Sequence, residues 1–147
     1  MKCVILAGGK GTRISELSKR TPKPMIDILG EPIIIRLMKH YYKHGINDFI
    51  IAVGYKKKVF IDYFKKKKFK NWKIRIIDTG INTMTGGRLK RLKKYLKDNT
   101  FMLTYGDGLS NVNVKKLISF HFRSKKIGTL TAVRPPARFG AIKLNGK

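Results

Sequence analysis

The sequence predicts an α/β protein with a doubly wound, mostly parallel sheet and helices on both faces of that sheet. Short apolar runs of about five residues recur along the chain, as expected of parallel strands that are covered on both sides. Between them, apolar residues recur every three or four positions, which is typical of amphipathic helices. Because the two patterns alternate, they indicate βαβ units, with the loops that follow the strands gathered along one sheet edge.

The first half of the chain supplies the start of this alternation. Residues 3–7 form an apolar run that predicts a buried strand, and residues 25–28 predict a short strand before a turn at Leu29-Gly30. Pro32 is expected to open a helix that Gly45 closes. Residues 49–53 predict the next parallel strand. A second helix follows, with an apolar stripe made by Val59, Phe60, Tyr63 and Phe64.

The second half continues in the same way. We expect a strand at 73–78, a polar loop at 79–87, a helix at 88–96 and a strand at 101–105. Asn113 can cap a fourth helix. The residues expected to face inward from that helix are Val114, Leu117, Ile118, His121 and Phe122. Strands at 128–133 and 139–144 complete the prediction.

Length and composition indicate a single domain over residues 1–147, with enough apolar residues (42%) for a real core. Cys3 is the one cysteine, so no internal disulfide can form, and we expect a reducing, cytoplasmic location. No apolar run approaches the roughly 20 residues of a membrane-spanning helix, and the N-terminal run is too short for a signal peptide. We therefore expect no membrane partner.

The charge is strongly positive, with 34 Lys and Arg against 8 Asp and Glu and a formal net charge of +26. Such a charge is compatible with a module that binds nucleic acid. However, the lysines are spread along the chain, and there is neither a basic tail nor a recognisable nucleic-acid motif. A genome-wide bias toward lysine would give the same composition. We therefore rank nucleic acid last among the partners and expect the charge to help attract anionic substrates.

The first candidate site is the glycine-rich loop after the first predicted strand. Its sequence is Leu6-Ala7-Gly8-Gly9-Lys10-Gly11-Thr12-Arg13. Glycines let the backbone approach a ligand closely, and backbone N–H groups in such a loop form an anion site. Lys10 and Arg13 add positive charge, so the phosphate chain of a nucleotide is the simplest ligand. The spacing fits neither the dinucleotide fingerprint nor a P-loop. A tight structural turn is the alternative interpretation.

The second candidate is Asp107, which lies between two glycines at the end of a predicted strand. An accessible carboxylate there suits Mg²⁺, which binds few carboxylates together with phosphate oxygens. The alternative is a turn aspartate that bonds its own backbone. Asp107 is also the last acidic residue of the sequence, so a second metal carboxylate must come from upstream or be missing.

A third stretch, residues 83–91, leads through Gly86-Gly87 into a helix whose Arg88 could bind a phosphate or a base.

Together, the glycine-rich loop and Pro22-Lys23-Pro24-Met25 resemble the signature of the sugar-phosphate nucleotidyltransferases, which have a Rossmann-like fold. Residues 83–91 and Tyr105-Gly106-Asp107-Gly108 are similar to motifs of the glucose-1-phosphate cytidylyltransferases within that family. The resemblance covers essentially the whole chain.

The resemblance implies a Mg²⁺-dependent reaction of CTP with α-D-glucose 1-phosphate to give CDP-glucose and pyrophosphate, a route into the dideoxy sugars of surface polysaccharides such as the O-antigen. It implies that Lys23 contacts the transferring phosphates together with Arg13, that Thr83 and Arg88 bind the nucleotide, and that Asp107 binds the metal. The glycine-rich loop would hold the phosphates and ribose through Leu6, Ala7, Gly8, Gly9, Lys10, Gly11, Thr12 and Arg13. A nucleotidyltransferase for another base or another sugar phosphate is the alternative.

The sequence departs from this family in two ways. Family members are considerably longer and carry a C-terminal part with a second metal aspartate, and the segment between Phe64 and Asp78 is short here. We therefore expect a C-terminally truncated nucleotidyltransferase domain that binds CTP but turns over poorly. Because a core opened in this way exposes apolar surface, we also expect self-association into a homo-oligomer.

Overall fold

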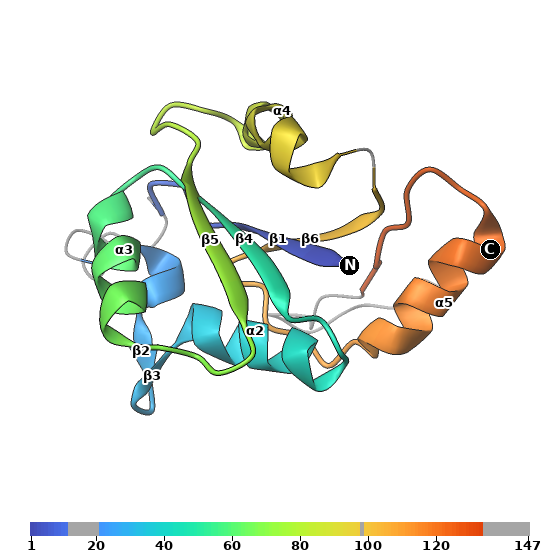
Figure 1. Cartoon of the computed structure of the whole chain (residues 1–147), viewed down its shortest axis with the longest axis horizontal. Coiled ribbons are helices and arrows are strands. Elements are labelled where there is room, and N and C mark those ends of the chain that lie inside the picture. Colours follow the sequence, from blue (N-terminus) through green and yellow to red (C-terminus); the bar gives the residue numbers. More distant parts are fainter. Residues whose placement is uncertain (12–20, 98, 134–147) are drawn as a thin grey trace, which may run out of the picture. The chain divides into compact units, whose positions relative to one another are not determined.

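The structure is a computed structural model that describes residues 1–11, 21–97 and 99–133. Its described residues form a four-stranded, fully parallel sheet in the order β5-β4-β1-β6 (Figure 1). The strands are β1 (Lys2–Leu6), β4 (Asp48–Val53), β5 (Lys73–Asp78) and β6 (Phe101–Tyr105). The predicted α/β class and all four of these strands are confirmed, and the bounds of β5 and β6 are those predicted from the sequence.

The chain runs outward from β1 in both directions, because β4 and β5 lie on one side of it and β6 lies on the other. Leu6, the last residue of β1, is paired with Ala52 of β4 and with Tyr105 of β6. The carboxyl ends of these three strands therefore meet at one edge. The strand order reverses between β1 and β6, and open parallel sheets bind ligands at such a reversal.

Helices cover both faces of the sheet. Figure 1 shows α4 (Thr85–Leu96) on one face, and α2 (Ile33–Lys43) and α3 (Lys57–Lys66) on the other. Alternate residues of β1 and β4 face α4, since side chains alternate along a strand. The resulting core cluster consists of Val4, Leu6, Ile50, Ala52, Leu92 and Leu96. On the other helices, Leu37 and Phe60 are among the fully buried side chains.

The strand predicted at 25–28 is only partly present. A 3₁₀ turn, η1 (Lys23–Met25), comes first, because prolines at 22 and 24 restrict the backbone and remove two N–H donors. A two-stranded hairpin follows, with β2 (Asp27–Ile28) and β3 (Glu31–Pro32). Its predicted turn is confirmed: Leu29 and Gly30 both have positive φ, as a two-residue hairpin turn requires, and Asp27 accepts a hydrogen bond from Gly30 N at 2.7 Å.

The third predicted helix begins earlier than expected. The polar loop was predicted to run to residue 87, but α4 starts at Thr85 and includes Gly86 and Gly87 in its first turn. Arg88 N already bonds Met84 O at 2.9 Å, which is the i to i−4 pattern of an α-helix. Glycine is a poor helix former by about 1 kcal/mol. The buried side chains that follow it, Arg88, Leu92 and Leu96, attach this helix to the sheet and offset that preference.

Residues 1–114 and 115–147 form two separate units. The predicted fourth helix is present as α5 (Val114–Ser124), but Phe122 is 57% exposed, so the expected inward face is wrong at that residue. The strand predicted at 128–133 is also wrong: the described residues offer no pairing partner there, and Leu130 is 95% exposed. The prediction at 139–144 lies outside the described residues. No helix in the described part of the chain is long and apolar enough to span a bilayer.

Candidate functional site

The glycine-rich loop continues β1 beyond the sheet edge. Ala7 N still donates to Ala52 O at 2.9 Å, and Gly8 is buried, whereas Gly9 and Lys10 are exposed. Gly11 has a φ of 65°, a conformation that glycine adopts without strain. The loop therefore leaves the core between Gly8 and Gly9. Two predicted residues, Thr12 and Arg13, lie outside the described residues.

The structure brings two predicted site residues into direct contact. Lys23 Nζ lies 2.5 Å from Asp107 Oδ2, and the two side chains are 37% and 30% exposed. Pro24 explains the approach, because a Cβ on Gly106 would lie 2.8 Å from Pro24 Cγ. Only a residue without a side chain fits at position 106, so η1 packs directly on the chain that leaves β6. Gly106 N in turn donates to Leu6 O at 2.9 Å, which ties Asp107 to the end of β1.

The residues at this edge fit a magnesium ion that is bound together with a phosphorylated ligand. Asp107 supplies one partly exposed carboxylate, which forms an ion pair with the Lys23 ammonium. Within the described ranges, no three His, Cys, Asp or Glu side chains are grouped as a metal cage. Mg²⁺ commonly uses only one or two carboxylates and completes its shell with phosphate oxygens and water. The donor set therefore matches a metal that arrives with a nucleotide.

Arg88 is buried, with 5% of the residue exposed. Its Nη2 donates to Gly8 O at 2.9 Å. Its Nη1 lies within hydrogen-bond distance of three acceptors, Thr79 Oγ1 at 2.6 Å, Gly80 O at 2.9 Å and Val53 O at 3.2 Å. Burial lowers the pKa of Arg88, the charge of Arg91 lowers it further, and Asp78 opposes both. The guanidinium remains charged at neutral pH, because its ordinary pKa is so high.

Thr79 is a functional candidate that sequence reasoning did not single out. It is fully buried, and its hydroxyl donates to Val53 O at 2.8 Å while it accepts from Arg88. The preceding Asp78 accepts hydrogen bonds from Gly80 N at 2.9 Å and from Lys57 at 2.6 Å. The Lys57 bond, followed by that from Gly80, lowers the pKa of Asp78. In the sequence, Thr79 appears only as the first residue of the polar loop predicted at 79–87.

Thr83, which was predicted to bind the nucleotide, is partly buried in the loop between β5 and α4. A Cβ on Gly80 would lie 2.9 Å from Thr83 Oγ1, and a Cβ on Gly87 would lie 2.9 Å from Thr83 Cγ2. Thr83 therefore sits between two glycines of its own loop and helix. Arg88 donates both to Gly80 O in this loop and to Gly8 O in the glycine-rich loop, so its side chain connects the two loops.

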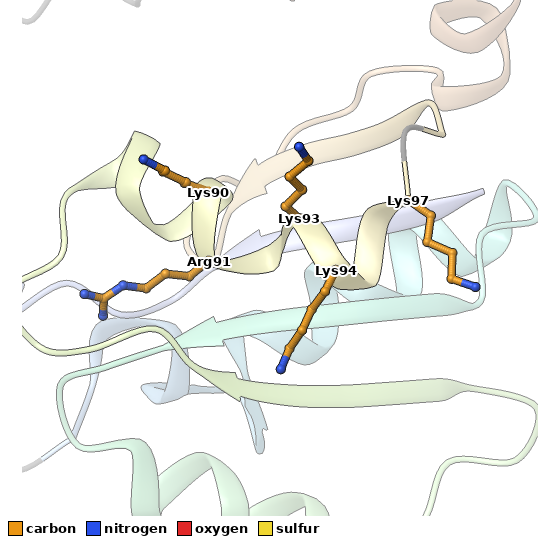
Figure 2. Close-up of a pocket in the computed structure, with 5 residues that line it drawn as sticks. All are labelled: Lys90, Arg91, Lys93, Lys94 and Lys97. Atoms are coloured by element: carbon orange, nitrogen blue, oxygen red, sulfur yellow. The ribbon is translucent and has the colours of Figure 1, made fainter.

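A separate pocket of about 470 Å³ lies along α4. Figure 2 shows the five cationic side chains that line it, Lys90, Arg91, Lys93, Lys94 and Lys97. Arg91 extends toward the carboxyl ends of the strands, where it donates to Thr79 O at 2.7 Å, whereas Lys97 lies at the other end of the helix. The pocket is therefore lined by the charged surface of α4, and its lining residue Arg91 contacts the loop of the candidate site through Thr79.

Comparison with known proteins identifies the family. The family model described as nucleotidyl transferase matches residues 2–147. Glucose-1-phosphate cytidylyltransferase of Salmonella typhimurium is 45% identical over 164 aligned positions, which cover 97% of this chain and 64% of the relative. The probable glucose-1-phosphate cytidylyltransferase of Bacillus subtilis is 40% identical, with the same coverage.

The chain thus spans about 64% of the length of these curated relatives. The alignment with the Salmonella protein is longer than the 147 residues of this chain, so that relative carries residues that this chain lacks. Among solved structures, HddC from Yersinia pseudotuberculosis in complex with GMP-PN is 36% identical, with a TM-score of 0.72 over 82% of this chain and 53% of that one. Sequence and fold agree, and the chain belongs to the nucleotidyl transferase family.

Proposed function

We propose that this chain is the nucleotide-binding part of a glucose-1-phosphate cytidylyltransferase, which forms CDP-glucose and pyrophosphate from CTP and α-D-glucose 1-phosphate. One observation carries the proposal: the Lys23–Asp107 ion pair stands at the carboxyl edge of the sheet, where β6 and the glycine-rich loop after β1 meet. The identity to two cytidylyltransferases supports the choice of CTP and of the sugar phosphate.

The reaction needs positioning and charge neutralisation more than it needs a base. A phosphate oxygen of glucose 1-phosphate forms a bond to the α-phosphorus of CTP, and the bond from that phosphorus to the β-phosphate oxygen breaks, so that pyrophosphate leaves with its electron pair. The attacking phosphate is already an anion, and no proton has to be removed. Catalysis therefore rests on holding the two phosphates in line and on stabilising the charge of the leaving group.

We assign the roles within the chain as follows. Leu6 and Ala7 lead into the loop whose Gly8, Gly9, Lys10, Gly11, Thr12 and Arg13 bind the phosphates and ribose. Lys23 contacts the transferring phosphates, and Thr83 and Arg88 contribute to binding of the nucleotide. Asp107 would hold Mg²⁺, which neutralises phosphate charge when it is bound. We also propose that the protein acts in the cytoplasm, in the synthesis of surface polysaccharide, and that it self-associates.

The choice of base is the least constrained part of the proposal. The structural relative in complex with GMP-PN shows that this fold accepts a guanine nucleotide as well. Titration of the four nucleoside triphosphates separates the possibilities. Preferential binding of CTP supports the proposal, and preference for another triphosphate replaces it with the alternative nucleotidyltransferase.

The direct test is a calorimetric titration of CTP, with and without Mg²⁺, into the wild-type chain, Asp107→Asn and the control Asp62→Asn. Asp62 lies exposed on α3, so its variant removes the same charge away from the site. We expect CTP binding to require Mg²⁺ and to weaken at least about tenfold in Asp107→Asn, since even residues beside metal ligands have effects of that size. Equal binding by the two variants would contradict the proposal. Pyrophosphate release from CTP and glucose 1-phosphate then measures turnover.

A further inference from the structure

We infer that Arg88 is a positioning residue that orients the peptide between Gly8 and Gly9 and thereby couples the two loops of the nucleotide site. The inference rests on the proposed function for the nature of the ligand, a nucleoside triphosphate. It differs from the expected role of Arg88 as a direct contact, because the guanidinium acts here through the backbone of the glycine-rich loop.

The first step is the orientation of one peptide group. Gly8 O accepts hydrogen bonds from Arg88 Nη2 at 2.9 Å and from Tyr55 N at 3.2 Å, and both donors lie on the inner side of the loop. In a trans peptide the C=O and the next N–H point in opposite directions, and no cis peptide is present in the described residues. Anchoring Gly8 O inward therefore directs Gly9 N–H outward, toward the side where a phosphate would bind.

The second step is that one guanidinium connects three loops. The same group that donates to Gly8 O also donates to Val53 O at the end of β4 and to Gly80 O after β5. In the described part of the chain its acceptors are all neutral oxygens, and it forms no ion pair with a carboxylate there. A lysine at this position has a single side-chain nitrogen, whereas the acceptors here are bound by two different nitrogens of the guanidinium. The fork of the arginine is therefore specific to this role.

The third step is that two glycines make room for the guanidinium. A Cβ at Gly8 would collide with Arg88 Nη1, and a Cβ at Gly54 would lie 2.8 Å from the same atom and 2.5 Å from Gly80 O. The loop after β1 and the end of β4 are thus both shaped around Arg88. A change at Gly54, outside the glycine-rich loop, should consequently disturb phosphate binding, because the added Cβ displaces both the guanidinium and the Gly80 carbonyl that it binds.

The test uses inorganic tripolyphosphate, which carries the phosphate chain without base or ribose, beside CTP. Both are titrated with Mg²⁺ into wild type, Arg88→Lys and Gly54→Ala, with Lys90→Gln as the control for a lost charge on the same helix. We expect Arg88→Lys to weaken both ligands by the same factor, about 10- to 100-fold, Gly54→Ala to weaken both as well, and Lys90→Gln to change neither by more than about threefold. If Arg88→Lys weakened CTP but not tripolyphosphate, Arg88 would contact the base or ribose directly and the inference would be wrong.

A ligand-free measurement separates this inference from the proposed function. Amide hydrogen exchange of residues 7–11 should be about tenfold faster in Arg88→Lys, while the amides of α2 keep their wild-type rates. Faster exchange in both segments would mean general destabilisation, and unchanged exchange at 7–11 would mean that Arg88 does not hold the loop; either result overturns the inference. If wild type binds neither ligand, the proposed function fails, and the exchange result still decides the role of Arg88.

Discussion

At the scale of single residues, Asp107 combines an ion pair with partial exposure. Its carboxylate is neutralised by Lys23 at 2.5 Å, and both side chains remain about one third exposed. The carboxylate therefore has a cationic partner, and it is exposed enough for another cation to replace that partner. Under the proposed function, Lys23 would compete with the metal at Asp107 and, once displaced, would be available to a phosphate.

This competition predicts the behaviour of Lys23→Gln. The variant removes the competing cation, so Mn²⁺, a spectroscopic substitute for Mg²⁺, should bind the ligand-free protein about two- to fivefold more tightly, as expected for a partly exposed ion pair. Binding of CTP with Mg²⁺ should weaken, because a phosphate partner is lost. Electron paramagnetic resonance of free Mn²⁺ measures the first effect, and calorimetry measures the second.

Lys39→Gln is the matched control, because Lys39 forms an ion pair of similar length with Glu31 at 2.6 Å. That variant should leave both affinities at their wild-type values. Unchanged or weaker Mn²⁺ binding by Lys23→Gln would show that Lys23 does not compete at Asp107.

At the scale of elements, α4 combines a charged surface with an apolar attachment. No acidic residue lies between positions 85 and 97, and neighbouring cations such as Lys90 and Lys94 stand four residues apart. Like charges at this spacing destabilise a helix by about 0.2–0.5 kcal/mol per pair. The helix is held instead by Leu92 and Leu96, which pack in the cluster with Val4 and Ile50.

We therefore expect Leu92→Ala to lower the free energy of unfolding by about 2–5 kcal/mol, because it leaves a cavity under a helix that has little stability of its own. Urea denaturation followed by circular dichroism measures this change. The control Lys93→Ala, on the exposed side, should remain within about 0.5 kcal/mol of wild type. A loss below about 1 kcal/mol in Leu92→Ala would mean that the sheet does not depend on this contact.

At the scale of the whole molecule, the net charge of +26 is the dominant property. The sequence has 34 Lys and Arg but 8 Asp and Glu, so there are too few carboxylates to pair with most of the cations. Such a charge repels itself in the compact state and attracts polyanions from solution. Both effects are screened by salt, because the Debye length falls from about 30 Å at 0.01 M to about 8 Å at 0.15 M.

This screening predicts opposite responses of stability and binding. Raising NaCl from about 0.01 to about 0.15 M should increase the melting temperature by a few degrees and should weaken the affinity for CTP. Differential scanning fluorimetry and calorimetry across one salt series measure both quantities, with KCl as the control for ion identity. A melting temperature that falls or stays constant would contradict self-repulsion as a destabilising force.

The sequence by itself determined the parallel sheet and which loops share its carboxyl edge. β5 and β6 have the predicted bounds because each is followed closely by a glycine, Gly80 and Gly106, that breaks a strand, and these are local signals. The placement of Asp107 near the glycine-rich loop also followed from the sequence, because parallel strands bring their carboxyl ends to one edge. Local patterning and chain topology were sufficient for both results.

Only the tertiary structure decided where Arg88 points and whether residues 128–133 form a strand. The sequence showed a basic residue at the start of a helix, whereas the fold buries that residue against Gly8, 80 positions earlier in the chain. In the same way, an apolar run becomes a strand only if another strand is present to pair with it, and 128–133 has no such neighbour among the described residues. Hydrogen bonds between distant segments depend on the assembled fold, and no local pattern records them.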